Sequence, residues 1–328
     1  MKIFITGSNG FVGSRLMWHL EDLGHQVHGI DKRDECLIEK HPQTRKGDIR
    51  EIDNLRDFNN VDIDLIIHCA ADKHDWGISK ESYFSNNEYG TKVLMQYASE
   101  RKINKVIYYS TVSVYGHASV PCDESGEIHP DNEYGESKLA GEKIIEKWLS
   151  EDETREGVFL RPTIIYGPYN YANMYNLVDM QHKKPLFMVG NGSHIKSIVS
   201  LANLVDMTVF IIPKMRSGLQ IFNCIDKPYI SLHRLMEIIA DNKGFSMPLI
   251  AIPLKLAVFI GKFFDVIGKI VKKDLPINSD RLMKLATSTE YHSEKIRKLG
   301  YTQKHTIESE ITRTTDWYLK KSNKPIVN

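Results

Sequence analysis

The chain has 328 residues, which at about 150 residues per domain predicts two compact units. It is 41% hydrophobic and 26% charged, a composition typical of a folded protein and not of a disordered one. Its 43 Lys and Arg residues nearly balance 42 Asp and Glu residues, so the formal net charge of +1 predicts no nucleic-acid partner.

Cysteine spacing and hydropathy predict the cellular compartment. Cys36, Cys69, Cys122 and Cys224 lie far apart, with neither a CxxC pair nor a zinc-like His/Cys cluster, so we expect reduced thiols and no metal site. An apolar run begins almost at once and reaches a glycine turn by residue 7, unlike a secretory leader. Because no stretch of about 20 apolar residues occurs, we expect a cytoplasmic protein without a spanning membrane segment.

The N-terminal residues predict a strand, a glycine turn and a helix. Residues 2–6 form a β-rich run, residues 7–13 space three glycines as GxxGxxG, and residues 11–23 carry apolar side chains at helical period. Such a turn holds a dinucleotide pyrophosphate on the free N–H groups of the helix, because glycine lets the phosphates approach. The residues predicted to bind the cofactor here are Gly7, Asn9, Gly10, Phe11, Val12 and Gly13.

A second predicted strand, residues 26–30, ends in Asp31, eighteen residues after Gly13. A carboxylate at this position accepts hydrogen bonds from both hydroxyls of an adenosine ribose and repels a 2′-phosphate. It therefore favours NAD over NADP, although the neighbouring cations Lys32 and Arg33 leave that choice open.

Strand and helix patterns then alternate. We predict strands at 63–69 and 105–110 and a long helix at 79–100, which indicates βαβ units in a parallel, doubly wound α/β sheet. Ligands bind such sheets at the carboxyl ends of the strands. The residues predicted to meet the cofactor at those ends are Asp48, Ile49, Cys69, Ala70, Ala71 and Ser110.

The candidate catalytic pair opens the next predicted helix, which runs to about Leu149. Tyr134 and Lys138 are four residues apart and therefore share one helix face. A free tyrosine is a poor base at neutral pH, but a neighbouring ammonium favours the phenolate. Such a phenol can take the proton of a substrate hydroxyl while a hydroxyl from residues 110–113 orients the substrate oxygen.

With these motifs in place, the sequence resembles the extended short-chain dehydrogenase/reductases, also called the NAD-dependent epimerase/dehydratase family, over nearly its whole length. The matching residues are Gly7, Gly10, Gly13, Asp31, Asp48-Ile49, His68-Cys69-Ala70-Ala71, Asn87, Gly90-Thr91, Val114-Tyr115-Gly116, Tyr134, Lys138 and Arg161-Pro162.

The resemblance implies an NAD-binding Rossmann domain over residues 1–165, with parts of roughly 195–228 returning to it. Residues 166–328 would mainly form a smaller, interleaved substrate-binding domain. Thr111 would complete a triad with Tyr134 and Lys138, and Asn87 would support the active-site helix. The implied cofactor is NAD, and a homodimer through the helices at 79–100 and 134–149 is expected. Further cofactor contacts would come from Lys32, Asn87, Tyr134, Lys138, Arg161, Pro162 and Ile164, and substrate contacts from Lys73, Thr111, Ser113, Tyr134 and Lys196.

The substrate implied most often in this family is a nucleotide-diphosphate sugar. Related dehydratases carry an Asp-Glu pair directly after the threonine, where this chain has Val112 and Ser113. That difference favours a 4-epimerase or a 4-ketoreductase, which need the same triad. Residues 75–77 (Asp-Trp-Gly) resemble the hydroxysteroid-dehydrogenase branch, so an enzyme that oxidises a larger apolar alcohol is one alternative. A non-catalytic NAD-binding regulator is another.

Residues 254–273 predict an amphipathic helix with a wide apolar face and lysines at 255, 262 and 269. Packing on the substrate domain is one interpretation. A membrane contact, or a lid over an apolar substrate, is the other.

Overall fold

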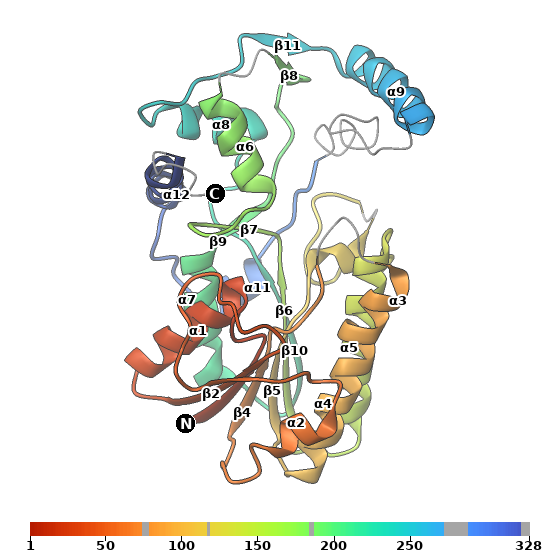
Figure 1. The fold of residues 1–328 in the computed structure, drawn as a ribbon, viewed down its shortest axis with the longest axis vertical. Helices are drawn as coiled ribbons and strands as arrows, with labels where there is room; N and C mark the ends of the chain where they lie inside the picture. The colour runs from red at the N-terminus through yellow and green to blue at the C-terminus, as the bar shows by residue number, and fades with distance from the viewer. Residues whose placement is uncertain (74–78, 117–118, 184–186, 272–287, 323–328) are drawn as a thin grey trace. The chain divides into compact units, whose positions relative to one another are not determined.

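The computed structural model describes residues 1–73, 79–116, 119–183, 187–271 and 288–322 (Figure 1). Its contacts divide the chain into two compact units. The first comprises Met1–Ile165, Leu201–Ile225 and Tyr291–Lys304, and the second comprises Tyr166–Ser200, Asp226–Glu290 and His305–Asn328. The return of Tyr291–Lys304 to the first unit was not predicted from the sequence. The roles predicted for the two domains stay predictions.

The first unit contains β1 (Lys2–Thr6), α1 (Phe11–Asp22), β2 (Gln26–Asp31), β3 (Thr44–Lys46), α2 (Ile52–Arg56), β4 (Leu65–His68), α3 (Lys80–Tyr83), the π-helix η1 (Phe84–Tyr89), α4 (Gly90–Glu100), β5 (Lys105–Tyr109), the 3-10 helix η2 (Val112–Tyr115), α5 (Glu133–Ser150), β6 (Glu156–Pro162), α7 (Leu201–Ile211), η3 (Ile212–Lys214), β10 (Gly218–Cys224) and α11 (Glu294–Lys298).

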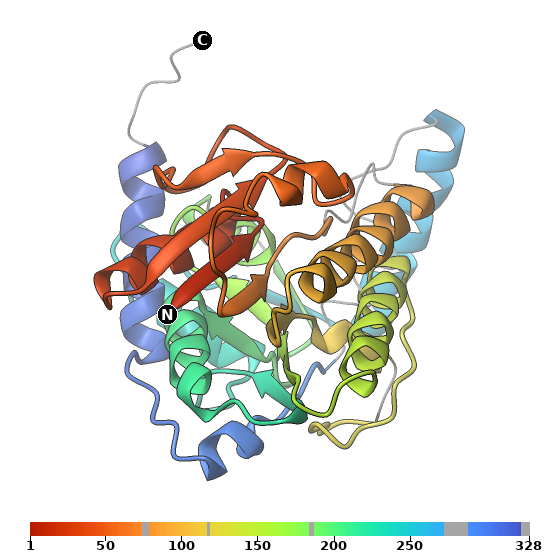
Figure 2. The same cartoon turned by 90° about the horizontal axis from the view of Figure 1, so that it is seen from below.

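Its centre is a seven-stranded sheet in the order β10-β6-β5-β4-β1-β2-β3, with every neighbouring pair parallel. The sheet is the predicted doubly wound Rossmann arrangement. The strand order reverses between β1 and β4, where Thr6 pairs with His68. Figure 2 shows α1 and α7 on one side of the sheet and α4 and α5 on the other. The carboxyl ends of β1 and β4 therefore lie where such sheets bind ligands.

The core of this unit lies between the sheet and its helices. Phe4 of β1 is fully buried and packs on Phe58, with ring centroids 4.8 Å apart, and on Tyr97 of α4 at 6.4 Å. Trp148 of α5 belongs to the same buried cluster. Helices anchored by aromatic side chains on one sheet face leave the strand ends in a fixed geometry.

The sequence predicts a long helix over residues 79–100, and the structure has a continuous helical run over residues 80–100, although its middle part is not α-helical. The segment forms α3, then the π-helix η1, then α4. Within η1, the side chain of Asn87 bonds to the backbone of Asp72 and to Ser137, so it engages groups outside its own helix. A π-turn inserts an extra residue into the helix, and such turns are frequent at functional sites.

The second unit contains α6 (Asn173–His182), β8 (Phe187–Val189), β9 (Ile198–Ser200), α8 (Leu232–Ala240), β11 (Ile250–Ile252), α9 (Leu254–Val271) and α12 (Ile307–Ser322), and β7 (Ile164–Tyr166) contains the boundary after Ile165. Strands β8 and β11 pair in parallel. Among the described residues, we find no helix with the length and apolar character required to span a membrane. The last two residues of the predicted helix 254–273 lie outside the described residues.

Candidate active site

The glycine turn between β1 and α1 is packed too tightly for side chains. Gly7 has φ +70°, and a Cβ on it would lie 2.7 Å from the backbone nitrogen of Ala70. A Cβ on Gly13 would collide with the carbonyl oxygen of Gly7. The turn therefore needs glycine at both positions, and it holds the start of α1 against the chain that leaves β4.

This turn fits the polar groups of a dinucleotide. Gly10 is the N-cap of α1, and no side chain of the described residues caps the helix there. The first N–H groups of the helix, at 11–13, therefore give this end a positive partial charge. Among the described residues, the side-chain oxygens of Asn9 and Ser110 are buried without a hydrogen-bond partner. Open N–H donors at a helix N-terminus suit a bound pyrophosphate, and the orphaned Asn9 and Ser110 oxygens suit hydrogen-bond donors of a bound ligand.

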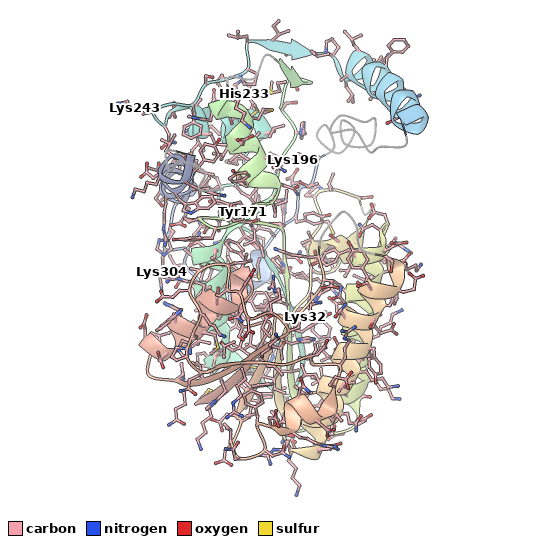
Figure 3. The ribbon with its side chains drawn as sticks, in the orientation of Figure 1. Lys32, Tyr171, Lys196, His233, Lys243 and Lys304 are labelled. Atoms are coloured by element: carbon pink, nitrogen blue, oxygen red, sulfur yellow. The ribbon has the colours of Figure 1, made fainter. Side chains whose placement is uncertain are left out.

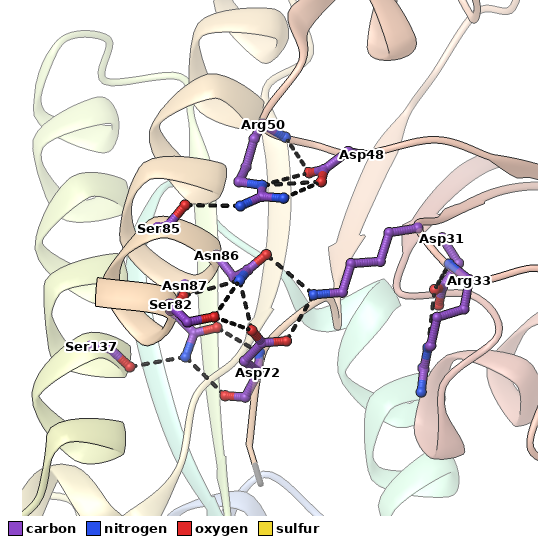
Figure 4. A network of polar contacts seen from close by, with 11 residues as sticks. Asp31, Arg33, Asp48, Arg50, Asp72, Ser82, Ser85, Asn86, Asn87 and Ser137 are labelled. Carbon is purple, nitrogen blue, oxygen red and sulfur yellow. Dashed lines mark hydrogen bonds and ion pairs between the residues drawn. The ribbon is translucent and has the colours of Figure 1, made fainter. Parts of the chain in front are cut away.

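Asp31 ends β2 with a buried carboxylate. Its Oδ2 accepts the backbone N–H of Asn9 at 3.0 Å, and its Oδ1 accepts the backbone N–H of Arg33 at 2.9 Å. The Nε of Arg33 lies 3.4 Å from Oδ1 (Figure 4). Each carboxylate oxygen has two lone-pair sites, and Oδ1 accepts both Arg33 groups, so Oδ2 has one site left for a further hydrogen bond. Its contact with ribose hydroxyls stays a prediction.

Lys32 is directed toward a neighbouring carboxylate. Its Nζ lies 2.9 Å from Oδ1 of Asp72 and 3.3 Å from Oδ1 of Asn86 (Figure 4). The other oxygen of Asp72 accepts Asn86 Nδ2 at 2.6 Å and Ser82 Oγ at 3.2 Å. Because Lys32 and Arg33 each pair with a carboxylate, they are less suited to bind a 2′-phosphate, which favours NAD.

Asp48 and Ile49, which are predicted to meet the cofactor, follow β3. Arg50 holds the Asp48 carboxylate through Nε at 3.0 Å and Nη2 at 2.6 Å, and it reaches Ser85 Oγ at 2.9 Å (Figure 4). Burial favours a higher pKa for Asp48, but the hydrogen bonds from Arg50 outweigh it and lower the pKa. A Cβ on Gly90 would lie 2.9 Å from Ile49 Cδ1. These contacts fix the loop after β3 against η1 and α4.

Asn87 joins the chain after β4 to α5. Its Oδ1 accepts the backbone N–H of Asp72 at 2.8 Å, while its Nδ2 lies 3.0 Å from the Asp72 carbonyl oxygen and 2.9 Å from Ser137 Oγ (Figure 4). Asn87 is fully buried, so these bonds are made away from water. Ser137 directly precedes Lys138, and Asn87 thus contacts the helix it was predicted to support.

The candidate hydroxyls lie at the start of η2, which packs on α5, the helix that carries the candidate base. Thr111 caps η2: its Oγ1 accepts the backbone N–H of Ser113 at 3.2 Å and lies 3.2 Å from Ser113 Oγ. A Cβ on Gly135 would lie 2.6 Å from the Ser113 carbonyl oxygen. Asn132 caps α5 by accepting the Gly135 N–H at 2.8 Å. Glycine at 135 therefore lets the first turn of α5, which carries Tyr134, approach the backbone of Ser113 closely.

Lys138 is buried on the adjacent turn of α5, with 1% of its surface exposed. Its Nζ lies 4.0 Å from the centroid of the Tyr108 ring, a cation–π contact. Burial lowers the pKa of Lys138 to about 7, against smaller opposing effects of Cys69 and Glu142. A Cβ on Gly141 would collide with the Tyr108 hydroxyl, so the helix can lie against this ring only with glycine there.

His68 is a packing residue at the end of β4. Its Nδ1 lies 2.7 Å from Thr6 Oγ1, and its Nε2 lies 3.0 Å from Thr91 Oγ1. Burial, with a smaller effect of Lys138, holds the pKa of His68 well below 6.5, so the ring is neutral at physiological pH. Within the described residues, no three His, Cys, Asp or Glu side chains gather as a metal site would require.

Arg161, Pro162 and Ile164 stand at the end of β6 and the start of β7. Arg161 forms a buried ion pair with Glu142, at 2.8 Å and 2.6 Å, and its Nη1 donates to the Tyr115 hydroxyl at 2.9 Å. This side chain ties β6 to α5 and η2. The cofactor contacts predicted for Arg161, Pro162 and Ile164 stay predictions.

Two predicted substrate contacts are lysines. Lys73 follows β4 in the first unit, with its Nζ 5.8 Å from the Phe11 ring centroid. Lys196 belongs to the second unit, where burial lowers its pKa to about 8 (Figure 3). The substrate contacts of both stay predictions. The segment at 75–77, which suggested the hydroxysteroid alternative, lies outside the described residues.

Sequence reasoning missed three residues that shape the site: Asp72, Arg50 and Tyr108. Asp72 carried a usable signal, because it directly follows the predicted strand-end residues Ala70 and Ala71. Arg50 and Tyr108 carried none, since a surface cation and a strand tyrosine are ordinary in any sequence. Their importance comes from contacts with Asp48 and Lys138 that only the fold creates.

Comparison with known proteins identifies the family. The model of the NAD dependent epimerase/dehydratase family matches residues 3–224. The chain belongs to this family.

Similar proteins include an N-acetyl-alpha-D-glucosaminyl-diphospho-ditrans,octacis-undecaprenol 4-epimerase of Escherichia coli O157:H7, 26% identical over 96% of this chain and 95% of that protein. A UDP-glucose 4-epimerase of Vibrio cholerae is 27% identical over 98% and 97%. The solved structure of a UDP-glucuronic acid 4-epimerase from Bacillus cereus, in complex with NAD, superimposes with a TM-score of 0.76 at 23% identity over 99% of this chain and 100% of that one. Our protein is thus an enzyme of the NAD-dependent epimerase/dehydratase family, and its cofactor is NAD.

The buried ammonium yields a prediction about stability. An unfolded lysine binds its proton up to about pH 10.4, whereas folded Lys138 releases it near pH 7. Below pH 7 the free-energy cost of burying the charge is fully present. Between pH 7 and the unfolded pKa the unfolded chain binds more protons than the folded one, so this cost is relieved as the pH rises. Lys138→Met should therefore raise the free energy of unfolding at pH 6. Each pKa unit corresponds to about 1.36 kcal/mol, so the gain is at most about 5 kcal/mol. The loss of the cation–π contact with Tyr108 reduces that gain.

Urea unfolding at pH 6 and pH 9 measures this effect, and the gain should shrink at the higher pH. Lys92→Met, which changes an exposed lysine of α4, is the control and should change stability little at either pH. A gain from Lys138→Met that is equal at both pH values would contradict a depressed pKa.

The glycine turn yields a prediction about cofactor affinity. A methyl group at Gly13 must displace the Gly7 carbonyl and deform the turn, so Gly13→Ala should weaken NAD binding at least tenfold. Gly24→Ala is the control, because Gly24 also has positive φ (+83°) but has no atom within 4 Å of an added Cβ. Calorimetric titration with NAD distinguishes the two, and equal affinities in both variants would show that the turn does not hold the cofactor.

Proposed function

We propose that the protein is a 4-epimerase that acts on a sugar carried by a diphosphate, with Tyr134 as acid/base, Lys138 as its electrostatic partner and Thr111 as the group that orients the reacting oxygen. The observation that carries this proposal is the buried Lys138, one helical turn from Tyr134, on a helix that packs against the Thr111 turn. A lysine whose pKa is about 7 is rare unless its site requires a tuned charge.

The chemistry assigned to these residues follows from their positions. Thr111 donates to the substrate oxygen, while Tyr134 removes the hydroxyl proton and later returns it to the carbonyl oxygen. A protonated Lys138 stabilises the phenolate, and its buried position strengthens this effect because water screens it weakly. Bound NAD supplies the hydride acceptor and the hydride donor of such a cycle.

Epimerisation is favoured over 4,6-dehydration by the residues after Thr111. Eliminating water from a keto sugar needs a general acid and a base at that point, but the positions hold Val112 and Ser113. Val112 is buried and apolar. Both curated relatives described above are named 4-epimerases, and each aligns with nearly the whole chain.

A second candidate substrate is a sugar joined through diphosphate to a polyprenol. The Escherichia coli relative is named for such a substrate, while the Vibrio cholerae relative is named for a nucleotide sugar. The two candidates share the sugar diphosphate and differ in the group beyond it. A cluster of exposed apolar side chains at 249–259 in the second unit favours the lipid-linked form.

The homodimer predicted from the family resemblance is also a proposal. A groove beside η1 and α5 is lined by the apolar side chains Phe84, Leu139, Ala140 and Ile144, with Glu88, Glu136, Lys143 and Lys147 among its other residues. Apolar lining with charges of both signs suits a surface that meets its own copy.

Loss of the phenol tests the proposed mechanism. Tyr134→Phe removes only the ionisable oxygen, and with it the rate enhancement that a general base supplies. Turnover should therefore fall at least 10³-fold, while NAD affinity stays within a few-fold of wild type. Tyr89→Phe, an exposed tyrosine at the end of η1, is the control and should keep wild-type turnover. Turnover close to wild type in Tyr134→Phe would remove Tyr134 from the mechanism.

The fate of the cofactor tests the reaction type. An epimerase regenerates its NAD in each cycle, so we expect denatured protein to release bound NAD(H) and incubation with substrate to interconvert C4 epimers without net NADH. Sugars of UDP, GDP and dTDP and a polyprenyl diphosphate sugar are the substrates to compare by product chromatography. Protein that releases no nucleotide and consumes NADH in proportion to product would instead be a ketoreductase.

A further inference from the structure

An apolar surface in the second unit is exposed to an unusual degree. It comprises Leu249, Ile250, Leu254, Leu256 and Phe259, and we call it the 249–259 surface. Leu249 is 83% exposed, Phe259 72% and Ile250 61%, the three highest values among large hydrophobic side chains of the described residues. Single exposed apolar residues are ordinary, but a contiguous group marks an interaction site.

The surface is formed by β11 and the first turns of α9 (Figure 1). One edge of α9 packs on the protein, since Ala257 is only 3% exposed. Leu256 and Phe259, three residues apart, lie on another face and are 51% and 72% exposed. Helix α9 therefore has apolar side chains both on the side that packs on the protein and on a side that is exposed.

Positive charge accompanies these apolar residues. Residues 249–273 contain five lysines and one aspartate, a net charge of +4, whereas the whole chain has +1 and the remaining residues therefore sum to −3. Lys255 and Lys262, within α9, are exposed. A polar face of lysines beside large apolar residues is the pattern of helices that lie in a membrane interface.

We propose that the 249–259 surface docks on an anionic lipid bilayer, with its apolar side chains at the headgroup boundary and its lysines against lipid phosphates. A second copy of the chain is a poorer occupant, because a two-fold contact would bring the same lysines face to face. The helix would lie in the interface and not cross the bilayer, in keeping with its apolar length. This docking goes beyond the proposed function, because it requires neither turnover nor a particular sugar.

Vesicle flotation of the full-length protein tests the proposal. With vesicles of 30% phosphatidylglycerol in phosphatidylcholine, we expect the protein to float with the lipid, and we expect at least tenfold weaker partitioning on phosphatidylcholine alone. Raising NaCl to 0.5 M shortens the screening length to about 4 Å and should release most of the protein. Wild-type protein that stays in the aqueous fraction at every anionic lipid concentration overturns the proposal.

Matched variants locate the contact. Leu256→Ser with Phe259→Ser should lower partitioning at least tenfold, while Leu23→Ser, a 50% exposed leucine of the first unit, should leave it within twofold. Lys255→Glu with Lys262→Glu should lower it at least tenfold. The same change of net charge at exposed Lys243 and Lys320 should lower it less than threefold (Figure 3 labels Lys243).

Two results would overturn the assignment to this surface. One is an equal loss of binding in the target and control variants, which would indicate a general charge effect. The other is a wild-type protein that is a dimer and a Leu256→Ser, Phe259→Ser variant that is a monomer, with neither protein binding vesicles. That result would mean that a second copy covers the surface. Turnover of the same samples is measured separately, so failure of docking and failure of the proposed epimerisation are distinguishable.

Discussion

The burial of one lysine ammonium is the constraint on which the candidate site depends. Lys138 has 1% of its surface exposed, and removing a charge from water is costly unless its surroundings compensate. The Tyr108 ring, 4.0 Å from Nζ, supplies part of that compensation. Gly141 makes it sterically feasible, because any larger residue there would push α5 off the ring. A lysine held this way responds strongly to changes of charge nearby, because water screens it weakly.

A polar network fixes the position of the helix that carries Lys138 relative to the end of the sheet. Asp72 receives Lys32 from the end of β2 and Asn86 from η1, while its backbone is held by Asn87, which also reaches Ser137 (Figure 4). The end of the sheet predicted to bind the cofactor and the helix that carries Lys138 are therefore linked through side chains, not only through the shared core. The π-turn of η1 makes this possible, since it directs Asn87 out of its own helix.

Local patterns predicted the local elements. β1 has the predicted limits, and α1 ends one residue before the predicted helix, because hydrophobic periodicity and glycine punctuation determine both. The π-turn within the helix over residues 80–100 was not predictable, since hydrophobic periodicity does not report the bonds that Asn87 makes to residues far away in sequence. Glu142 has the charged neighbours Lys143 and Glu146 on α5, yet it is buried against Arg161 of β6. Tertiary pairing of this kind leaves no trace in periodicity.

The sequence left residues 254–273 open between a packed helix and a membrane contact, and the reason is physical. Periodicity reports how wide an apolar face is, but not how much of it the protein itself covers. In the described part of α9 these two quantities separate: Ala257 is buried, while Phe259 is 72% exposed. The free-energy cost of exposing such a side chain to water grows with its apolar area. A wide, half-covered apolar face beside lysines is therefore stabilised by an anionic lipid bilayer, which is apolar inside and negatively charged at its surface. An enzyme whose substrate is a sugar diphosphate held in the membrane would meet the bilayer and its substrate at the same place.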